Sequence, residues 1–325
     1  MPDSKSARST GYSESQLAHV AMLYYREGLT QGDIAQRLGV SRATVLNYLK
    51  LARDLGIVDI RIRGESFTSS SLSKELSERF GLTDCYIAHT DADGQDEDQV
   101  LSRVAHLAAS ALRDLLEPGD KLGVAWGETI QQVAHSFPVG PVPSLTVYQL
   151  IGSMMYDPLH PPEDCAIEIA RRTLAACRTL HAPAMVSSAD LAESLRAEPI
   201  LAHQLRELAS VDKAVFSVGS LNPPKTVIGS GLVTEEELDT YLSRGAIGVF
   251  WGHFIKADGK AVPGPLDRRA IGIELEALRQ IPMRMLVASG VGKYEAVRAA
   301  IKGGLVTHLV TDEPCALWLS QNSPD

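Results

Sequence analysis

The apolar residues near the start of the chain recur with the period of an α-helix. Over residues 14–27, four of them fall at i, i+3, i+4 and i+7 on one helical face: Leu17, Val20, Ala21 and Tyr24. Ser13 is a suitable N-cap for this helix, and Gly28 follows it as a stop signal. The pattern therefore predicts a first amphipathic helix that packs through this apolar face.

Two shorter helices are predicted directly after the first. Thr30 caps one of them with Asp33 at the third helical position, as in a capping box, and Ser41 caps the next. Gly39 fits the turn between them, because a residue without a Cβ atom adopts positive φ at little cost. The expected inner positions are Ile34, Ala35 and Leu38 on one helix and Val45, Leu49 and Ala52 on the other. A small Ala35 at the close crossing, with Gly39 four residues later, is typical of a helix-turn-helix.

This motif predicts contacts to DNA. In a helix-turn-helix, the second helix enters the major groove with its N-terminal residues at the base edges. Arg42 could pair with guanine and Asn47 with adenine, whereas Gln31 and Ser41 at helix N-termini suit phosphate groups. The expected outward positions are Arg42, Thr44, Asn47 and Lys50. The full set of expected DNA contacts is Gln31, Ser41, Arg42, Thr44, Asn47, Lys50 and Arg53.

The segments that flank the motif give two further predictions. Residues 58–64 alternate apolar with polar side chains, which predicts a half-buried strand. This strand could form a wing whose Arg61 and Arg63 touch the DNA backbone, or the two arginines could lie on a solvated strand face. Residues 1–11 are polar and are predicted to form a disordered tail. The helix-turn-helix domain is thus expected to span residues 12–64.

From residue 65 onward, predicted strands alternate with predicted helices. The strands are expected over 84–90, 121–126, 144–152, 213–219, 283–289 and 307–312. The helices are expected over 69–81, 96–119, 128–137, 163–177, 235–245, 294–304 and 314–321. Such alternation indicates a parallel sheet covered by helices on both faces, a Rossmann-like α/β fold. One domain is therefore expected over residues 65–325.

Three of these strands lead into turns that suit an anionic ligand. The turns are Gly127 to Thr129, Gly219 to Ser220, and Ser289 to Lys293. Ligands of parallel sheets bind outside the carboxyl ends of the strands, near helix N-termini. Free N–H groups after Gly127 with the Thr129 hydroxyl could hold an anion, and Lys293 could neutralise a phosphate. Each turn could instead be only a turn, and Lys293 a solvated helix end, but the three together favour a shared phosphorylated ligand.

The charge distribution supports two domains of different character. The net charge of −9 argues by itself against a nucleic-acid or anionic-membrane surface. Residues 1–64, however, contain nine Lys or Arg against six Asp or Glu, a net +3, which leaves −12 for residues 65–325. The polar start leads into no apolar segment, and no stretch approaches about 18 apolar residues. No secretory signal or membrane span is therefore expected, and the predicted location is the cytoplasm.

Residues with catalytic or metal-binding chemistry form no recognisable motif. The four cysteines and nine histidines show neither disulfide nor metal-ligand spacing, so no metal or cofactor is expected. A nucleophile elbow, a Walker loop, an HExxH motif and a dinucleotide fingerprint are all absent from the sequence. Asp312 and Glu313 could act as an acid–base pair, but Pro314 in the first turn favours a helix cap. The chain is therefore predicted not to be an enzyme.

Several long motifs resemble the SorC family of sugar-responsive bacterial transcription regulators, and the similarity covers nearly the whole chain. The helix-turn-helix segment is LTQGDIAQRLGVSRATV. The most specific segment is VASGVGKYEAVRAAIKGGLVTHLVTDEPCA. Shorter matching segments are LARDLGIVDIRI, GVAWGETI, EELDTYLSRGAIG, ADGKAV and RRAIGIELEALRQIP.

The resemblance implies a DNA-binding regulator of a carbohydrate or polyol catabolic operon. It implies an effector domain similar to sugar-phosphate isomerases and glucosamine-phosphate deaminases, and a homodimer or homotetramer. The effector would be a sugar, a sugar phosphate or a polyol. With the adjacent polar residues of the same loops, the expected effector contacts are Gly127, Glu128, Thr129, Gly152, Ser153, Gly219, Ser220, Ser289 and Lys293. The alternative is an isomerase- or deaminase-like enzyme fused to a DNA-binding module, with Asp312 or Glu313 in catalysis.

The chain departs from the family pattern at two positions. The family commonly reads Gly-Asp and then Phe-Phe-Asp before a turn, whereas this chain has Val249 in place of the first Asp and Lys256 in place of the second. Acidic side chains near a sugar accept hydrogens from its hydroxyl groups. Their replacement leaves the identity of the sugar open, and His253 with Lys256 could favour a more anionic ligand.

Overall fold

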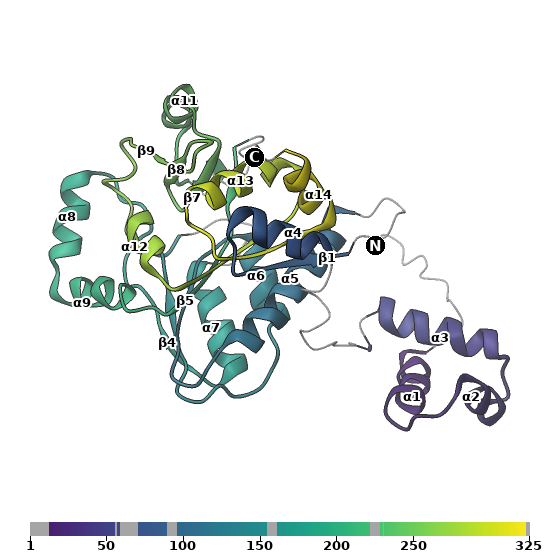
Figure 1. The fold of residues 1–325 in the computed structure, drawn as a ribbon. Helices are drawn as coiled ribbons and strands as arrows, with labels where there is room; N and C mark the ends of the chain where they lie inside the picture. Colours follow the sequence, from purple (N-terminus) through teal and green to yellow (C-terminus); the bar gives the residue numbers. More distant parts are fainter. Residues whose placement is uncertain are drawn as a thin grey trace, which may run out of the picture. The chain divides into compact units, whose positions relative to one another are not determined.

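The structure, a computed structural model, consists of two units with separate cores (Figure 1). It describes residues 13–55, 57–58, 71–89, 96–154, 161–221, 228–229 and 231–322. Contacts divide the chain into the units Met1–Ile62 and Arg63–Asp325. The predicted tail over residues 1–11 and the predicted wing arginines Arg61 and Arg63 lie outside the described residues.

The N-terminal unit contains the predicted helix-turn-helix. Its described helices are α1 (Glu14–Tyr25), α2 (Gln31–Leu38) and α3 (Arg42–Asp54). Ser13, Thr30 and Ser41 cap them as expected, and Gly39 takes the left-handed conformation with φ 67°. The core consists of Leu17, Val20, Ala21, Leu23, Ile34, Ala35, Val45, Leu49 and Ala52. Leu38 was expected in this core, but it is 36% exposed because it ends α2 beside the turn.

A seven-stranded sheet lies at the centre of the part of the C-terminal unit that the structure describes. Its strands, in spatial order, are β1 (Asp84–Ala88), β11 (His308–Asp312), β10 (Met283–Ala288), β5 (Lys213–Phe216), β2 (Lys121–Val124), β3 (Thr146–Gln149) and β4 (Ala176–Arg178). Every neighbouring pair is parallel. The predicted parallel α/β fold is therefore confirmed.

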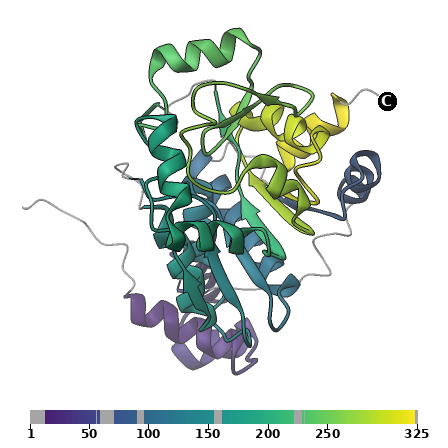
Figure 2. The ribbon, with the colours of Figure 1, turned by 90° about the vertical axis from the view of Figure 1, so that its left-hand side faces the viewer.

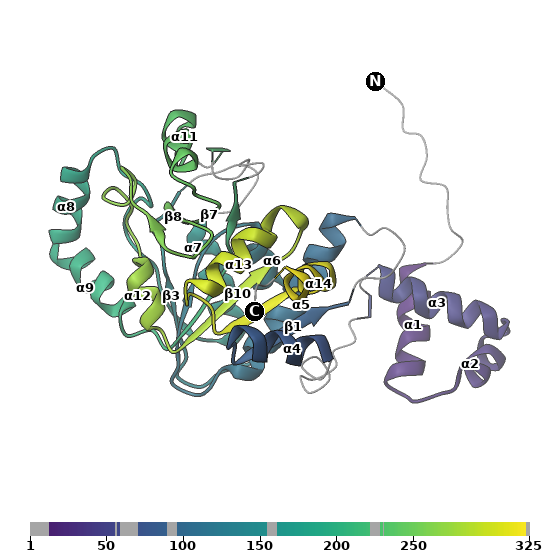
Figure 3. The same ribbon diagram turned by 45° about the horizontal axis from the view of Figure 1, so that its top comes forward.

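Helices cover both faces of this sheet, and each face has its own apolar cluster. One cluster joins the sheet to α5 (Glu97–Leu115), α6 (Glu128–Ser136) and α7 (Pro162–Thr173). The other joins it to α4 (Ser71–Phe80), α12 (Leu275–Gln280), α13 (Tyr294–Lys302) and α14 (Glu313–Gln321). Figure 3 shows α13 and α14 on the side of the sheet that carries α4. Continuous burial on both faces explains the uninterrupted apolar runs of the central strands.

Several elements were not predicted. The helices α8 (Ala189–Ala197) and α9 (Pro199–Leu208) follow β4, on the side of the unit that faces the viewer in Figure 2. A four-stranded antiparallel sheet contains β6 (Gly219–Ser220), β7 (Gly248–Phe250), β8 (His253–Ile255) and β9 (Ala261–Val262). The helix α11 (Glu235–Ser243) packs on it, with Tyr241 stacked on Phe254 at a centroid distance of 4.0 Å. These strands are only two or three residues long, so alternation could not identify them.

Two predicted elements were placed wrongly. The helix expected over 163–177 ends at Thr173, because Leu174 adopts a left-handed conformation with φ 53°. The residues after it form β4 instead. The strand expected over 213–219 ends at Phe216, and Gly219 belongs to the second sheet. Among the described residues, no helix is both long and apolar enough to cross a membrane, and no cluster of side chains could hold a metal ion.

Candidate DNA interface and effector site

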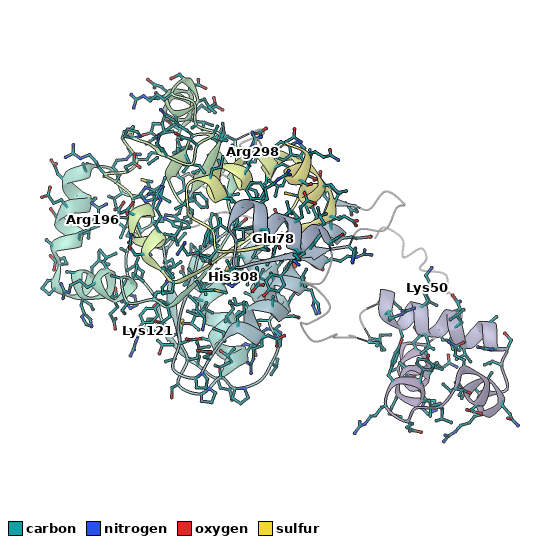
Figure 4. The ribbon with its side chains drawn as sticks, in the orientation of Figure 1. Lys50, Glu78, Lys121, Arg196, Arg298 and His308 are labelled. Carbon is teal, nitrogen blue, oxygen red and sulfur yellow. The ribbon has the colours of Figure 1, made fainter. Side chains whose placement is uncertain are left out.

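The exposed face of α3 carries most of the side chains that were predicted to contact DNA. Arg42, Asn47, Lys50 and Arg53 are exposed, while Val45, Leu49 and Ala52 on the opposite face are buried. Lys50 points away from α1 and α2 in Figure 4. Because the inner face holds the helix in place, the polar side chains are free to meet another molecule.

The N-termini of α2 and α3 lie close together. The Nε of Arg42 donates to Oε1 of Gln31 at 3.4 Å. Two side chains that were predicted to contact DNA from different helices are therefore in direct contact with each other. Both border a hollow of about 700 Å³ that is lined by Tyr24, Tyr25, Gly28, Leu29, Thr30, Gln31, Gly32 and Arg42. Helix N-termini favour anions, so this arrangement is suited to a phosphate group.

The two remaining predicted residues at the start of α3 are engaged with each other. The Oγ of Ser41 accepts a hydrogen bond from the backbone N–H of Thr44 at 3.0 Å, and the two hydroxyl oxygens are 2.8 Å apart. Thr44 is half-buried, so it is less available to DNA than an outward position would be. Leu46, which was not predicted to contact DNA, is 54% exposed on the outer face of α3. Its position four residues after Arg42 was the signal that could have identified it.

The turns that were predicted to bind the effector lie near the point where the strand order of the large sheet reverses. The strands β2, β3 and β4 follow one another toward one edge, whereas β5, β10 and β11 run toward the other. The neighbours β2 and β5 therefore form the switch point of the sheet. In open α/β sheets, ligands bind outside the carboxyl ends of the strands at such a point.

The predicted turns after β2 and β10 meet at this position. The Nζ of Lys293 donates to Oγ1 of Thr129 at 3.1 Å, across 164 residues of chain. Thr129 is buried in the first turn of α6, and Gly127, with φ 130°, precedes that helix without a side chain to cap it. The first N–H groups of α6 are thus left for another acceptor.

Burial and two nearby carboxylates shift the pKa of Lys293 in opposite directions. Burial lowers the pKa of its ammonium group, and the negative charges of Glu128 and Asp312 partly oppose this effect. A partly desolvated ammonium group interacts strongly with an anion that comes close to it. The arrangement is therefore suited to binding a phosphate.

Asp312 has a structural role beside Lys293. Its Oδ1 accepts the backbone N–H of Cys315 at 2.7 Å, which caps α14, and its Oδ2 accepts the N–H of Gly290 at 2.8 Å. The carboxylate is buried and fixes the loop after β10 to the end of β11. Glu313 lies 3.6 Å from Nδ1 of His89, measured from its Oε2. The helix-cap interpretation of Asp312 is confirmed, and this carboxylate is not free for proton transfer.

The turn after β5 contains a candidate ligand contact that was not predicted from the sequence. The Oγ of Ser217 is buried and has no hydrogen-bond partner among the described residues. Ser217 directly follows β5 at the switch point, where a ligand could pair with its hydroxyl. Gly219 and Ser220 form β6 and pair with β7, so Gly219 lies opposite Val249. The departure from the family pattern at Val249 therefore lies beside the predicted effector loops.

Gly152 and Ser153 serve mainly to pack the loop after β3. The N–H of Gly152 donates to the carbonyl of Ile271 at 2.9 Å, and that of Ser153 donates to the carbonyl of Ala182 at 2.8 Å. A Cβ atom on Gly152 would lie 2.5 Å from the backbone of Pro183. Of the predicted effector residues, only Ser153 borders a hollow of about 500 Å³, whose lining also includes Glu163, Thr179 and His181.

The hypothesis that His253 attracts an anionic ligand is not supported by the surroundings of its ring. His253 is buried, with Nδ1 3.1 Å from Oδ1 of Asp267 and Nε2 3.7 Å from Oε2 of Glu274. Two carboxylates beside the ring repel a further anion. Lys256 is exposed, and its backbone N–H donates to the carbonyl of Lys260.

Comparison with known proteins identifies both units. Residues 65–319 match the family "Putative sugar-binding domain", and residues 16–66 match an HTH domain family. The uncharacterized transcriptional regulator YjhU of Escherichia coli K12 is 34% identical over 98% of each chain. The transcriptional regulator LsrR of Klebsiella pneumoniae is 31% identical over 93% of this chain and 92% of its own.

A solved structure extends this similarity over both units. The full-length sorbitol operon regulator SorC of Klebsiella pneumoniae superposes with a TM-score of 0.76 and 25% identity, and the match covers 96% of this chain and all of that one. A DeoR family transcriptional regulator from Listeria monocytogenes covers 76% of this chain with a TM-score of 0.70 and 28% identity. The chain therefore belongs to the SorC family of sugar-binding transcription regulators, as its helix-turn-helix and its parallel α/β domain indicate.

Proposed function

We propose that this regulator binds operator DNA through α3 and responds to a phosphorylated sugar or polyol bound at the switch point of its large sheet. The DNA-binding domain would span residues 12–64 and the effector domain residues 65–325. The bond between Lys293 and Thr129 is the observation that carries the effector proposal, because it joins a cation to the uncapped N-terminus of α6. The relatives named as transcriptional regulators support the assignment to gene control.

The groups around Lys293 and Thr129 favour a phosphate group on the effector. Lys293 supplies a positive charge, and the N–H groups at the start of α6 supply donors aligned with a helix dipole. The free hydroxyl of Ser217 could bind the sugar or polyol portion of the ligand. Val249 offers no acceptor for sugar hydroxyls, so the phosphate would contribute more of the affinity than it would with an acidic residue there.

We infer that control follows from a shift between two arrangements of a homodimer or homotetramer that acts on DNA in the cytoplasm. An effector can shift such an equilibrium only if it binds one arrangement more tightly than the other. The change would alter how two recognition helices reach their half-sites on the operator. The product of the controlled operon would act on a carbohydrate or a polyol, in line with the sorbitol operon named for the relative SorC.

The enzyme alternative has little support. The two oxygens of Asp312 accept backbone hydrogen bonds, and Glu313 lies beside His89. The chain thus offers no ready acid–base pair at the ends of β10 and β11. The relatives named above are transcriptional regulators.

A thermal-shift experiment tests the effector proposal. The full chain is heated with a panel of sugar phosphates and polyol phosphates, and with each unphosphorylated parent compound at equal concentration. A phosphorylated ligand at a hundredfold excess over its Kd should stabilise the protein by about 2.7 kcal/mol, whereas its parent should not. Stabilisation by parent compounds alone would contradict a phosphate site.

Two variants locate the site of that ligand. Lys293→Met removes the charge, and Thr129→Val removes the hydroxyl at similar volume. Both should abolish most of the ligand-induced shift, because both groups lie where the phosphate would bind. Lys302→Met serves as the control, since Lys302 is exposed at the other end of α13. An unchanged shift in Lys293→Met would exclude a phosphate site at Lys293 and Thr129.

A further inference from the structure

The outer face of α3 combines apolar with basic side chains in an ordered row. Arg42, Leu46 and Lys50 are spaced four residues apart and therefore lie on one helical face. Leu46 is 54% exposed, and Ala43, one turn before it, is exposed as well. Asn47 lies beside Leu46 on the same face and is also exposed. A leucine thus occupies the middle of the surface that presents the polar candidates.

The charge around Leu46 indicates what kind of molecule covers it. Positions 42–53 contain three basic residues and no carboxylate. A basic rim around an apolar centre matches a duplex, in which phosphates flank a groove. The apolar group that the major groove presents is the C5-methyl group of thymine.

We propose that Leu46, together with Ala43, contacts thymine methyl groups in the major groove and so makes the regulator select thymine at one or two operator positions. This inference rests on the proposed function, since it requires that α3 enters the groove. Asn47 is placed to pair with adenine, and adenine lies opposite thymine. The residues Leu46 and Asn47 would therefore read A·T pairs that are the same or adjacent.

Thymine-to-uracil replacement tests this inference without altering the pattern of hydrogen bonds in the groove. The operator is first selected with the full-length protein from a randomised duplex library. Each thymine of the selected site is then replaced by deoxyuridine, which lacks only the methyl group. Loss of one contacted methyl group should weaken binding about fourfold, the equivalent of roughly 0.8 kcal/mol for one buried carbon group.

A cycle with Leu46→Ala assigns the contact to this side chain. At the sensitive thymine, the variant should bind the thymine and deoxyuridine duplexes with nearly equal affinity. Leu55→Ala is the matched control, because Leu55 is 65% exposed and follows the last turn of α3. This control should keep the fourfold sensitivity. Both leucines are exposed, so neither variant should lower the melting temperature.

Several results would overturn the inference. Deoxyuridine could be tolerated at every position, or the sensitivity could persist in Leu46→Ala. If Leu46→Ala changed the sedimenting mass but not the response to deoxyuridine, Leu46 would belong to a protein interface instead. A selection that enriched no sequence would contradict the proposed DNA reading itself, and this inference with it.

Discussion

The two units of this regulator present their functional groups in opposite ways. In the N-terminal unit, Arg42, Asn47 and Lys50 stand exposed on a helix whose other face is fully packed. In the C-terminal unit, Thr129 is buried and Lys293 is half-buried, and the two side chains are joined by a hydrogen bond. Substitutions on the exposed face of α3 should therefore change binding alone, whereas substitutions around Lys293 and Thr129 should often change binding and stability together.

The first prediction concerns the buried carboxylate of Asp312, which accepts hydrogen bonds from Gly290 and Cys315. Asp312→Ala should lower the free energy of unfolding of the C-terminal unit by about 2–4 kcal/mol, because it removes the cap of α14 and leaves the N–H of Gly290 unpaired. Calorimetry of the full chain would measure the loss. Asp312→Asn keeps one acceptor oxygen and should lose less. If the alanine variant were as stable as the wild type, the structural role of Asp312 would be refuted.

The second prediction compares one substitution in both units. Gly152→Ala should destabilise the C-terminal unit by about 1–3 kcal/mol, because its Cβ atom would meet the backbone of Pro183. Gly32→Ala in α2 should instead stabilise the N-terminal unit by up to about 1 kcal/mol, since its Cβ atom has room. The melting temperatures of the two transitions give the comparison. If the Gly152→Ala protein were as stable as the wild type but had lost its effector response, Gly152 would be a ligand contact and not a packing residue.

The third prediction separates DNA reading from folding. Arg42→Ala should reduce discrimination at one guanine position by about 1–3 kcal/mol and leave the melting temperature unchanged. Arg37→Ala is the control, because Arg37 is exposed in α2 and lies 3.8 Å from Glu27. Competition binding with operators that carry single base changes measures the effect. Equal specificity profiles for Arg42→Ala and the wild type would rule out base contact by this residue.

The smallest expected effect is a dependence of stability on pH. Burial lowers the pKa of His308 below its usual value of 6.5, and Asp84 only partly offsets this effect. The unfolded chain then binds more protons, so stability is complete above pH 6.5 and decreases as the pH falls through that value. His308→Gln should flatten this dependence in melting curves between pH 7.5 and 5.5. His203→Gln, at a ring that is 67% exposed, should not.

The helices of the N-terminal unit could be predicted more accurately from the sequence than the elements of the C-terminal unit, and the reason is physical. The helix-turn-helix depends on local signals, such as the capping box of Thr30 with Asp33 and the left-handed Gly39, so its helices could be predicted almost to the residue. Leu38 was predicted to be buried but is exposed beside the turn. Thr44 was predicted to face outward but is half-buried, and its hydroxyl contacts the cap residue Ser41. The strands β6 to β9 could not be predicted, because a strand of two or three residues is too short to show an alternation of apolar and polar side chains.

The turns of the candidate effector site could be predicted one by one, but their contact could not. The turns at Gly127 and Lys293 were recognisable from glycine and lysine at strand ends, yet their direct contact depends on the order of strands in the sheet. The close packing of Gly152 against Pro183 could not be predicted, because only the fold brings these two loops together. The buried hydroxyl of Ser217 gave no sequence signal, since a serine after a strand is common.

The most direct test of the account measures operator affinity with and without the phosphorylated ligand identified by thermal shift. In the wild type, saturating ligand should change the Kd for operator DNA at least fivefold, the lower end of usual allosteric coupling. In Lys293→Met, the Kd without ligand should match the wild type, and the same ligand should change it by less than about twofold. A Lys293→Met protein that responds as the wild type does would contradict control by a ligand bound at Lys293.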